Sequence, residues 1–87
     1  MPVTLSEVKE YLKVEYEDED ALLTTLLGSA EKLCADIVRA ELTDSETEKV
    51  AVLYAVGYLY EHRENADHQA LIRTLRALLF GQRQEVF

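Results

Sequence analysis

The chain has few of the residues that build covalent, metal or phosphate-binding sites. Cys34 is its only cysteine, so no intramolecular disulfide can form, and a zinc site built on several thiolates is excluded. Cys34 falls on an apolar helical stripe and is expected to be a small buried hydrophobe. The three glycines, at positions 28, 57 and 81, lie too far apart to form a phosphate cradle, and no serine or cysteine lies in a nucleophile elbow. We therefore expect no catalytic residue, no metal site and no cofactor, and we interpret the protein as a binding protein rather than an enzyme.

Positive charge and long hydrophobic runs are also scarce. The chain has 9 Lys and Arg residues against 17 Asp and Glu residues, which gives a net charge of −8 at pH 7. This charge disfavours nonspecific binding to nucleic acid, because such binding needs a basic face. Residues 50–60 form the longest apolar stretch without charge, well short of the roughly 20 residues that span a membrane. The first residues lack the apolar core of a signal peptide, so we expect a cytoplasmic protein.

Helical periodicity covers most of the 87 residues, a length typical of one domain. Thr4 and Glu7 have the spacing of a capping box, which predicts a short helix beginning at Leu5. A long second helix is predicted over about residues 19–40, because apolar residues recur there at spacings of three and four. Gly28, inside this helix, indicates either a close contact with another helix or a bend.

The third predicted helix covers about residues 45–63. Two capping boxes can start it, Thr43 with Glu46 or Ser45 with Glu48. Its centre is apolar nearly all the way round, which is typical of a helix enclosed by neighbours. The three tyrosines of this centre are expected to pack in the core with their hydroxyls at its edge, rather than to form a platform for stacking bases.

A fourth helix is predicted from the apolar stripe within residues 71–79, and Gly81 is placed to end it in a left-handed cap. The predicted fold is therefore all-α, a compact bundle of about four helices with a long second helix and a buried central third helix. We divide the chain into a helical domain, residues 1–81, and a C-terminal tail, residues 82–87.

Two groups of polar residues are candidate ligand sites. The acidic run at residues 15–20 lacks the glycine and the ligand spacing of an EF-hand calcium loop, and it is interpreted as a solvated cluster at a helix N-terminus. His62 and His68 do not have a metal-binding spacing, and both are interpreted as surface histidines.

Charge is distributed unevenly along the chain. Residues 1–48 carry 13 acidic and 4 basic side chains, whereas residues 49–87 carry 4 acidic and 5 basic ones. An acidic front and an arginine-bearing back can supply the two different patches of a head-to-tail interface. The candidate interface residues of this hypothesis are Glu17, Asp18, Glu19 and Asp20 at the front, and Arg73, Arg76, Arg83, Val86 and Phe87 at the back. Two interpretations of the tail stay open, because it either frays or anchors on another chain through its last two residues.

Three stretches of the sequence resemble a known family. They are the opening TLSEVKEYLKV at 4–14 followed by DEDALL at 18–23, the aromatic-rich YLYEHRE at 58–64, and LRALLFGQR at 75–83. In their order, these stretches resemble the gp6-like head–tail connector proteins of tailed bacteriophages, which are often labelled as DNA-packaging proteins. The likeness covers nearly the whole chain.

The resemblance implies a structural subunit of a homo-oligomeric ring of about a dozen copies that lies beneath the portal of the phage capsid. Its partners would be neighbouring copies, the portal protein and a tail-side adaptor, and DNA would pass through the ring without sequence recognition. An acidic lumen would favour that passage, because it repels phosphates. The expected location is the head–tail junction of the virion, and the cytoplasm of the bacterial host before assembly.

A second class of function also fits the residues. A small acidic helical regulatory protein or nucleic-acid mimic would place its acidic face in the basic groove of a partner, and it would be a monomer or a dimer. A helix-turn-helix DNA binder is disfavoured by the net charge and by the lack of a basic recognition helix.

Overall fold

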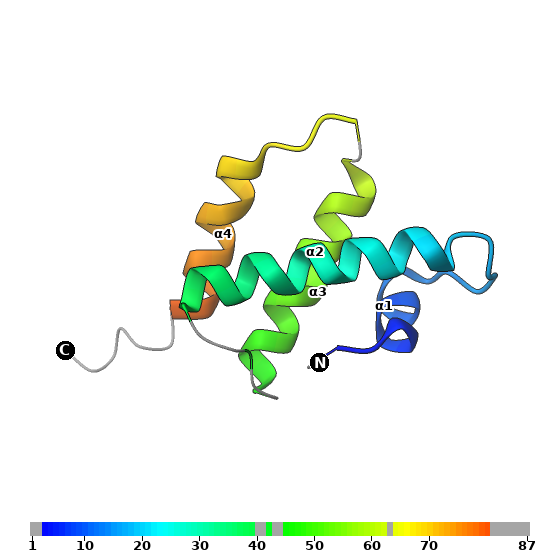
Figure 1. Cartoon of the computed structure of the whole chain (residues 1–87), viewed down its shortest axis with the longest axis horizontal. Helices are drawn as coiled ribbons and strands as arrows, with labels where there is room; N and C mark the ends of the chain where they lie inside the picture. Colours follow the sequence, from blue (N-terminus) through cyan, green and yellow to red (C-terminus); the bar gives the residue numbers. More distant parts are fainter. Residues whose placement is uncertain (1–2, 40–41, 43–44, 63, 81–87) are drawn as a thin grey trace.

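The computed structural model describes residues 3–39, 42, 45–62 and 64–80. In this part of the chain it contains four helices and no strand, which confirms the all-α fold (Figure 1). The helices are α1 (Leu5–Leu12), α2 (Asp20–Val38), α3 (Glu46–Glu61) and α4 (His68–Phe80). The second helix is the longest, as predicted, although it is shorter at both ends than the sequence pattern indicates. None of the described helices is both long and apolar enough to cross a membrane.

Two of the helix starts are set by side-chain caps that the sequence predicts. At α1 the Thr4 hydroxyl accepts the Glu7 backbone N–H at 3.1 Å, and the Glu7 carboxylate accepts the Thr4 backbone N–H at 2.9 Å. This second bond is the main cause of the lowered pKa of Glu7. At α3 the Ser45 hydroxyl accepts the Glu48 N–H at 3.2 Å, which decides between the two possible caps. Both caps satisfy backbone donors that have no partner inside the helix.

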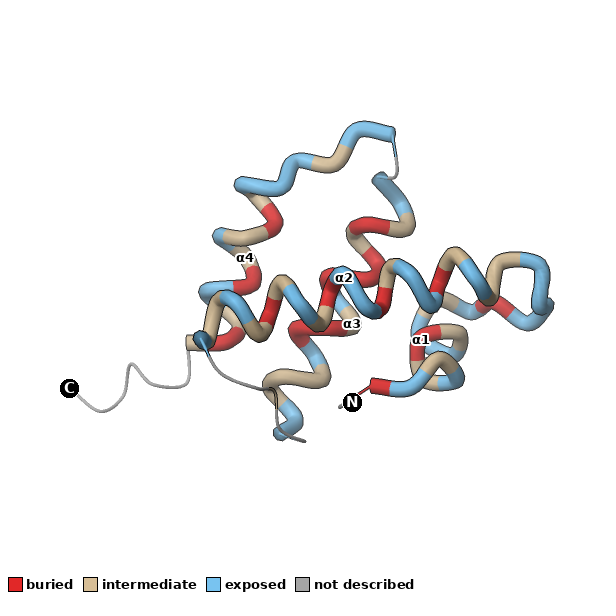
Figure 2. The backbone as a smooth tube through the Cα atoms, viewed as in Figure 1, coloured by how far each residue is buried: buried red, intermediate tan, exposed pale blue. Residues whose placement is uncertain are grey.

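The long helix α2 lies across α3 and contacts each of the other three helices (Figure 1). Its buried residues recur at spacings of three and four and form one stripe: Leu23, Leu27, Ala30 and Cys34. Complete burial of a leucine contributes about 2 kcal/mol to folding. Figure 2 shows that buried positions also run along α3 and along one side of α4. The core of the domain therefore lies where α2, α3 and α4 meet, and Val8 of α1 is also buried in it.

Cys34 belongs to this core, as predicted, and its side chain has no exposed surface. Burial is the main cause that raises the pKa of the Cys34 thiol to about 11, and the nearby carboxylates of Glu48 and Glu31 add to the effect. The thiol is therefore protonated at neutral pH, and the nucleophilic thiolate is not formed.

The structure overturns one of the two interpretations of Gly28, the close helix contact, and the bend stays a prediction. This residue is exposed, and a Cβ atom built on it would meet no atom within 4 Å, so the predicted close helix contact at this position is wrong. The close contact occurs at Gly57 of α3 instead. A Cβ atom there would lie 3.2 Å from Cε2 of Tyr11, so the glycine lets α1 approach α3. Helical spacing alone could not separate the two glycines, because each lies inside an apolar helix.

The central helix α3 is only partly enclosed. Its buried residues face the other helices, among them Val52, Val56 and Leu59. Val50 and Tyr54, however, are 52% and 36% exposed. The expectation of a central helix enclosed by its neighbours therefore holds for the buried side of α3. It does not hold for the stripe with Val50 and Tyr54, which the described helices leave exposed.

Candidate interaction surfaces

The connection between α1 and α2 forms an exposed acidic tip at one end of the described structure (Figure 1). Glu15, Glu17 and Asp18 lie in this connection, and all three are exposed (Figure 2). Lys13 begins it, in a left-handed conformation with φ of 61° that ends α1. Three carboxylates in one short connection create a strongly negative local potential.

The other two predicted acidic residues are partly buried. The Asp20 carboxylate forms an ion pair with Lys9 of α1 at 2.7 Å. The Glu19 carboxylate accepts a hydrogen bond from the Tyr60 hydroxyl of α3. The four predicted acids thus divide into Glu17 and Asp18, which face solvent, and Glu19 and Asp20, which hold the start of α2 against α1 and α3. Their interpretation as a solvated cluster is therefore correct for the first pair and wrong for the second, which is partly buried and bonded within the subunit.

The two described arginines of the predicted back surface are both on α4. Arg73 and Arg76 are exposed, and neither forms an ion pair within the described part of the chain. The spacing of three residues places them on one face of the helix, opposite the buried Leu71, Leu75 and Leu79. The remaining residues of the predicted back surface, Arg83, Val86 and Phe87, lie outside the described residues, as does the predicted cap at Gly81.

The acidic tip and the arginine face of α4 are far apart. The 19 residues of α2 make it about 28 Å long, and the acidic tip precedes its first residue. The helix α4 packs against α2 and α3 but makes no contact with α1 (Figure 1). Within one subunit the two patches cannot form ion pairs, so each is available to a different molecule.

The two histidines are on the surface, as predicted. His62 stacks on Tyr58 with a ring-centroid distance of 4.2 Å, and its Nδ1 lies 3.0 Å from the Tyr58 carbonyl oxygen. His68 is the exposed first residue of α4. Among the described residues no three His, Cys, Asp or Glu side chains are grouped in a way that could hold a metal ion.

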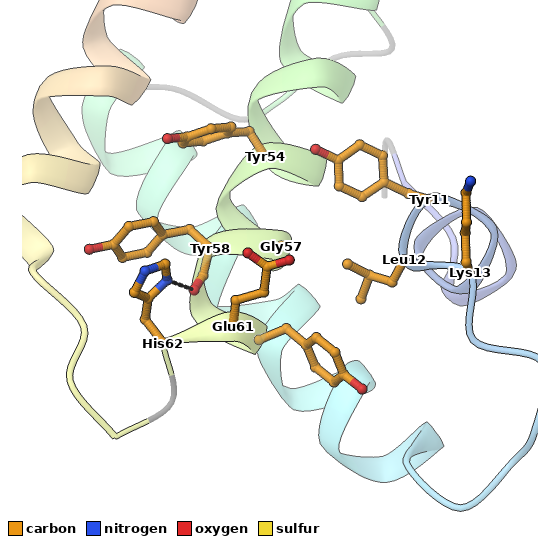
Figure 3. A pocket seen from close by; sticks show the side chains of 9 residues that line it. Tyr11, Leu12, Lys13, Tyr54, Gly57, Tyr58, Glu61 and His62 are labelled. Atoms are coloured by element: carbon orange, nitrogen blue, oxygen red, sulfur yellow. Dashed lines mark hydrogen bonds between the residues drawn. The ribbon is translucent and has the colours of Figure 1, made fainter.

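An aromatic groove between the end of α1 and the second half of α3 was not predicted from the sequence. It has a volume of about 510 Å³, and Figure 3 shows Tyr11 pointing from α1 toward α3 beside it. The aromatic groove is lined by Tyr11, Leu12, Lys13, Tyr54, Gly57, Tyr58, Tyr60, Glu61 and His62. Its two walls are more than 40 residues apart in the chain, so only the tertiary structure brings them together.

All three tyrosines of α3 line the groove, but they differ in exposure and in what their hydroxyls bond. The Tyr58 hydroxyl accepts the Asp67 backbone N–H at 3.0 Å, and the Tyr60 hydroxyl bonds to Glu19. For these two, the predicted packing with hydroxyls at the edge is confirmed. Tyr54 is more exposed than expected and forms part of the groove wall.

Comparison with known proteins agrees with the resemblance seen in the sequence. The family model for phage gp6-like head-tail connector proteins matches residues 2–78, which cover all of α1, α2 and α3 and most of α4. No curated protein and no solved structure gives a match in the same comparisons. The match covers well over half of the chain. The chain therefore belongs to the family of phage gp6-like head–tail connector proteins.

Proposed function

We propose that this protein is a structural subunit of a ring at the head–tail junction of a tailed bacteriophage or prophage, and that neighbouring copies pair head to tail. Membership of the connector family supports a structural role in the virion and gives no support to the alternative of a nucleic-acid mimic. The observation that most supports ring formation is the placement of an acidic tip and an arginine face at opposite ends of one subunit.

Two different patches on one molecule give a heterologous interface, which closes into a ring when the rotation between neighbours fits. Glu17 and Asp18 of one copy would then pair with Arg73 and Arg76 of the next. Each exposed ion pair contributes only about 0–1 kcal/mol, so these charges mainly select the orientation of neighbours. Burial of apolar surface must supply most of the association free energy.

The same charge distribution would favour the passage of DNA through the proposed ring. A ring that contacts its neighbours through the arginines leaves a surface dominated by carboxylates, because the chain carries a net charge of −8. Phosphates are repelled by such a surface and do not bind to it, so DNA slides through without being read. The portal protein and a tail-side adaptor are the further partners of the proposed ring.

Native mass spectrometry at several protein concentrations, with and without the portal protein, tests this proposal. We expect a ring-sized particle in at least one of these conditions, with less of it at high salt because screening weakens exposed charge pairs. A strict monomer at high concentration that does not bind portal would contradict the proposal and favour the mimic.

A further inference from the structure

The outward stripe of α3 is only partly covered within the described chain. Tyr11 packs on Gly57, whereas Val50, Tyr54 and Glu61 are exposed. Val50, Tyr54, Gly57 and Glu61 follow one another at spacings of four, three and four, so they share one face of the helix. Tyr11 borders this stripe and is 50% exposed. Half-exposed tyrosines around an open groove are typical of a surface that another chain covers.

The aromatic groove has one charge of each sign on its walls. Lys13 lines it on the α1 side and Glu61 on the α3 side (Figure 3). Both side chains are exposed, and neither has an ion-pair partner in the described structure. A segment that fills the groove would therefore combine an aromatic side chain with one positive and one negative charge.

We propose that the aromatic groove of each subunit binds residues 82–87 of a neighbouring copy. This segment has the sequence QRQEVF, and it carries one positive charge at Arg83, one negative charge at Glu85 and an aromatic side chain at Phe87. Arg83 would face Glu61, and Glu85 would face Lys13. Phe87 supplies the aromatic anchor, the kind of residue that dominates the energetics of interfaces.

The inference rests on the proposed head-to-tail ring, which brings the two parts together. Lys13 is both a wall of the groove and the first residue of the acidic connection, so the groove lies next to the acidic tip. A neighbour that pairs Arg76 with this tip has its Phe80 only one helical turn further along α4. Residues 81–87 can extend about 23 Å from there, enough to reach the groove.

Docking of the segment would also strengthen the ring without a large interface. Once the charged patches hold two copies together, the segment binds its groove at the high effective concentration of an intramolecular event. The exposed charges would then set the orientation of the copies, and the docked segment would slow their dissociation.

Photo-crosslinking tests the proposal in the full chain. Phe87 is replaced by p-benzoylphenylalanine, the protein is mixed from equal amounts of ¹⁴N- and ¹⁵N-labelled subunits before assembly, and crosslinked peptides are identified by mass spectrometry. We expect crosslinks from position 87 to Tyr11 or Tyr54, with light–heavy pairs as frequent as light–light and heavy–heavy pairs combined. Crosslinks confined to one chain would show that the segment folds back on its own subunit, and crosslinks to portal would show that portal is its partner; either result overturns the proposal.

A second experiment exchanges the charges of the groove and of the docked segment. Glu61→Arg and Arg83→Glu should each reduce the crosslink between copies about tenfold, and the double variant should recover most of it. Asp36→Arg on exposed α2, which does not line the groove, is the matched control and should leave the crosslink unchanged. Rings that form normally without a groove crosslink would overturn this inference and leave the proposed ring intact. Absence of any assembly, alone or with portal, would overturn both.

Discussion

The inner and outer faces of α3 differ in what they contact, although their residues are of similar types. On the inner face Val56 is completely buried by the other helices, whereas Val50 on the outer face is 52% exposed. The other helices of the same subunit bury the inner face. The outer face, with its tyrosines and the groove beside it, gains burial only from another molecule. The comparison separates the part of the core that stabilises the monomer from the part that is available for assembly.

The largest change in the free energy of unfolding is expected at Val56, with Val50 as the matched comparison. Val56→Ala removes two methyl groups from the core and should lower the free energy of unfolding by about 2 kcal/mol. Val50→Ala removes the same groups from an exposed position and gains helix propensity, so it should change stability by less than about 0.5 kcal/mol. Urea unfolding of both variants, followed by circular dichroism, checks this. Equal losses would mean that the outer face is also buried in the free subunit.

The second prediction concerns Cys34, on the helix that covers the inner face. Because burial raises the pKa of its thiol to about 11, the unfolded chain loses the proton at a lower pH than the folded one. Stability should therefore fall as the pH rises from about 9 toward 11. Cys34→Ala lacks this contribution and should lose less stability over the same range. Thermal unfolding of both proteins at pH 8 and pH 10.5 measures how much stability each loses over this range. Equal losses in the two proteins would show that the core does not protect the thiol.

A smaller effect is expected at the start of α1, the helix that borders the outer face. Thr4→Ala removes the hydroxyl that accepts the Glu7 N–H and should cost about 1 kcal/mol. Ser6→Ala is the control at an exposed position inside α1, and alanine there should be neutral or slightly favourable. Denaturant midpoints distinguish the two. Since α1 carries Tyr11, the Thr4 variant should also weaken crosslinking at the groove.

Local sequence signals predicted the helices well, because caps and apolar spacing depend on residues that are close in the chain. The capping box at Thr4, the cap at Ser45 and the buried position of Cys34 are examples. The sequence could not predict which apolar stripe the other helices leave exposed. The roles of Gly28 and Gly57 were not separable without knowing that Tyr11 packs on only one of them.

The charges of the candidate interaction surfaces could be predicted from the sequence, but the contacts that these charged residues make could not. The uneven distribution of acids and arginines is visible in the sequence, and Arg73 and Arg76 are exposed as the helical spacing indicates. The division of the acidic run depends on contacts across more than one helix. Lys9 neutralises Asp20, and a tyrosine hydroxyl from α3 binds Glu19, so these two acids are held within the subunit.

The central claim, that copies pair head to tail through the acidic tip and the arginine face, is tested most directly by mixing two charge-reversed variants. One carries Arg73→Glu with Arg76→Glu, and the other carries Glu17→Lys with Asp18→Lys. Each alone places like charges at every interface and should assemble poorly, whereas an equal mixture places opposite charges at every interface of an alternating ring. Lys32→Glu with Arg39→Glu, two exposed cations of α2 and its end, is the control and should assemble like the parent. Native mass spectrometry should show ring-sized particles for the mixture and mainly monomers for each variant alone. Assembly of either variant alone as well as the parent, or a mixture that stays monomeric while the parent forms rings, would contradict the account.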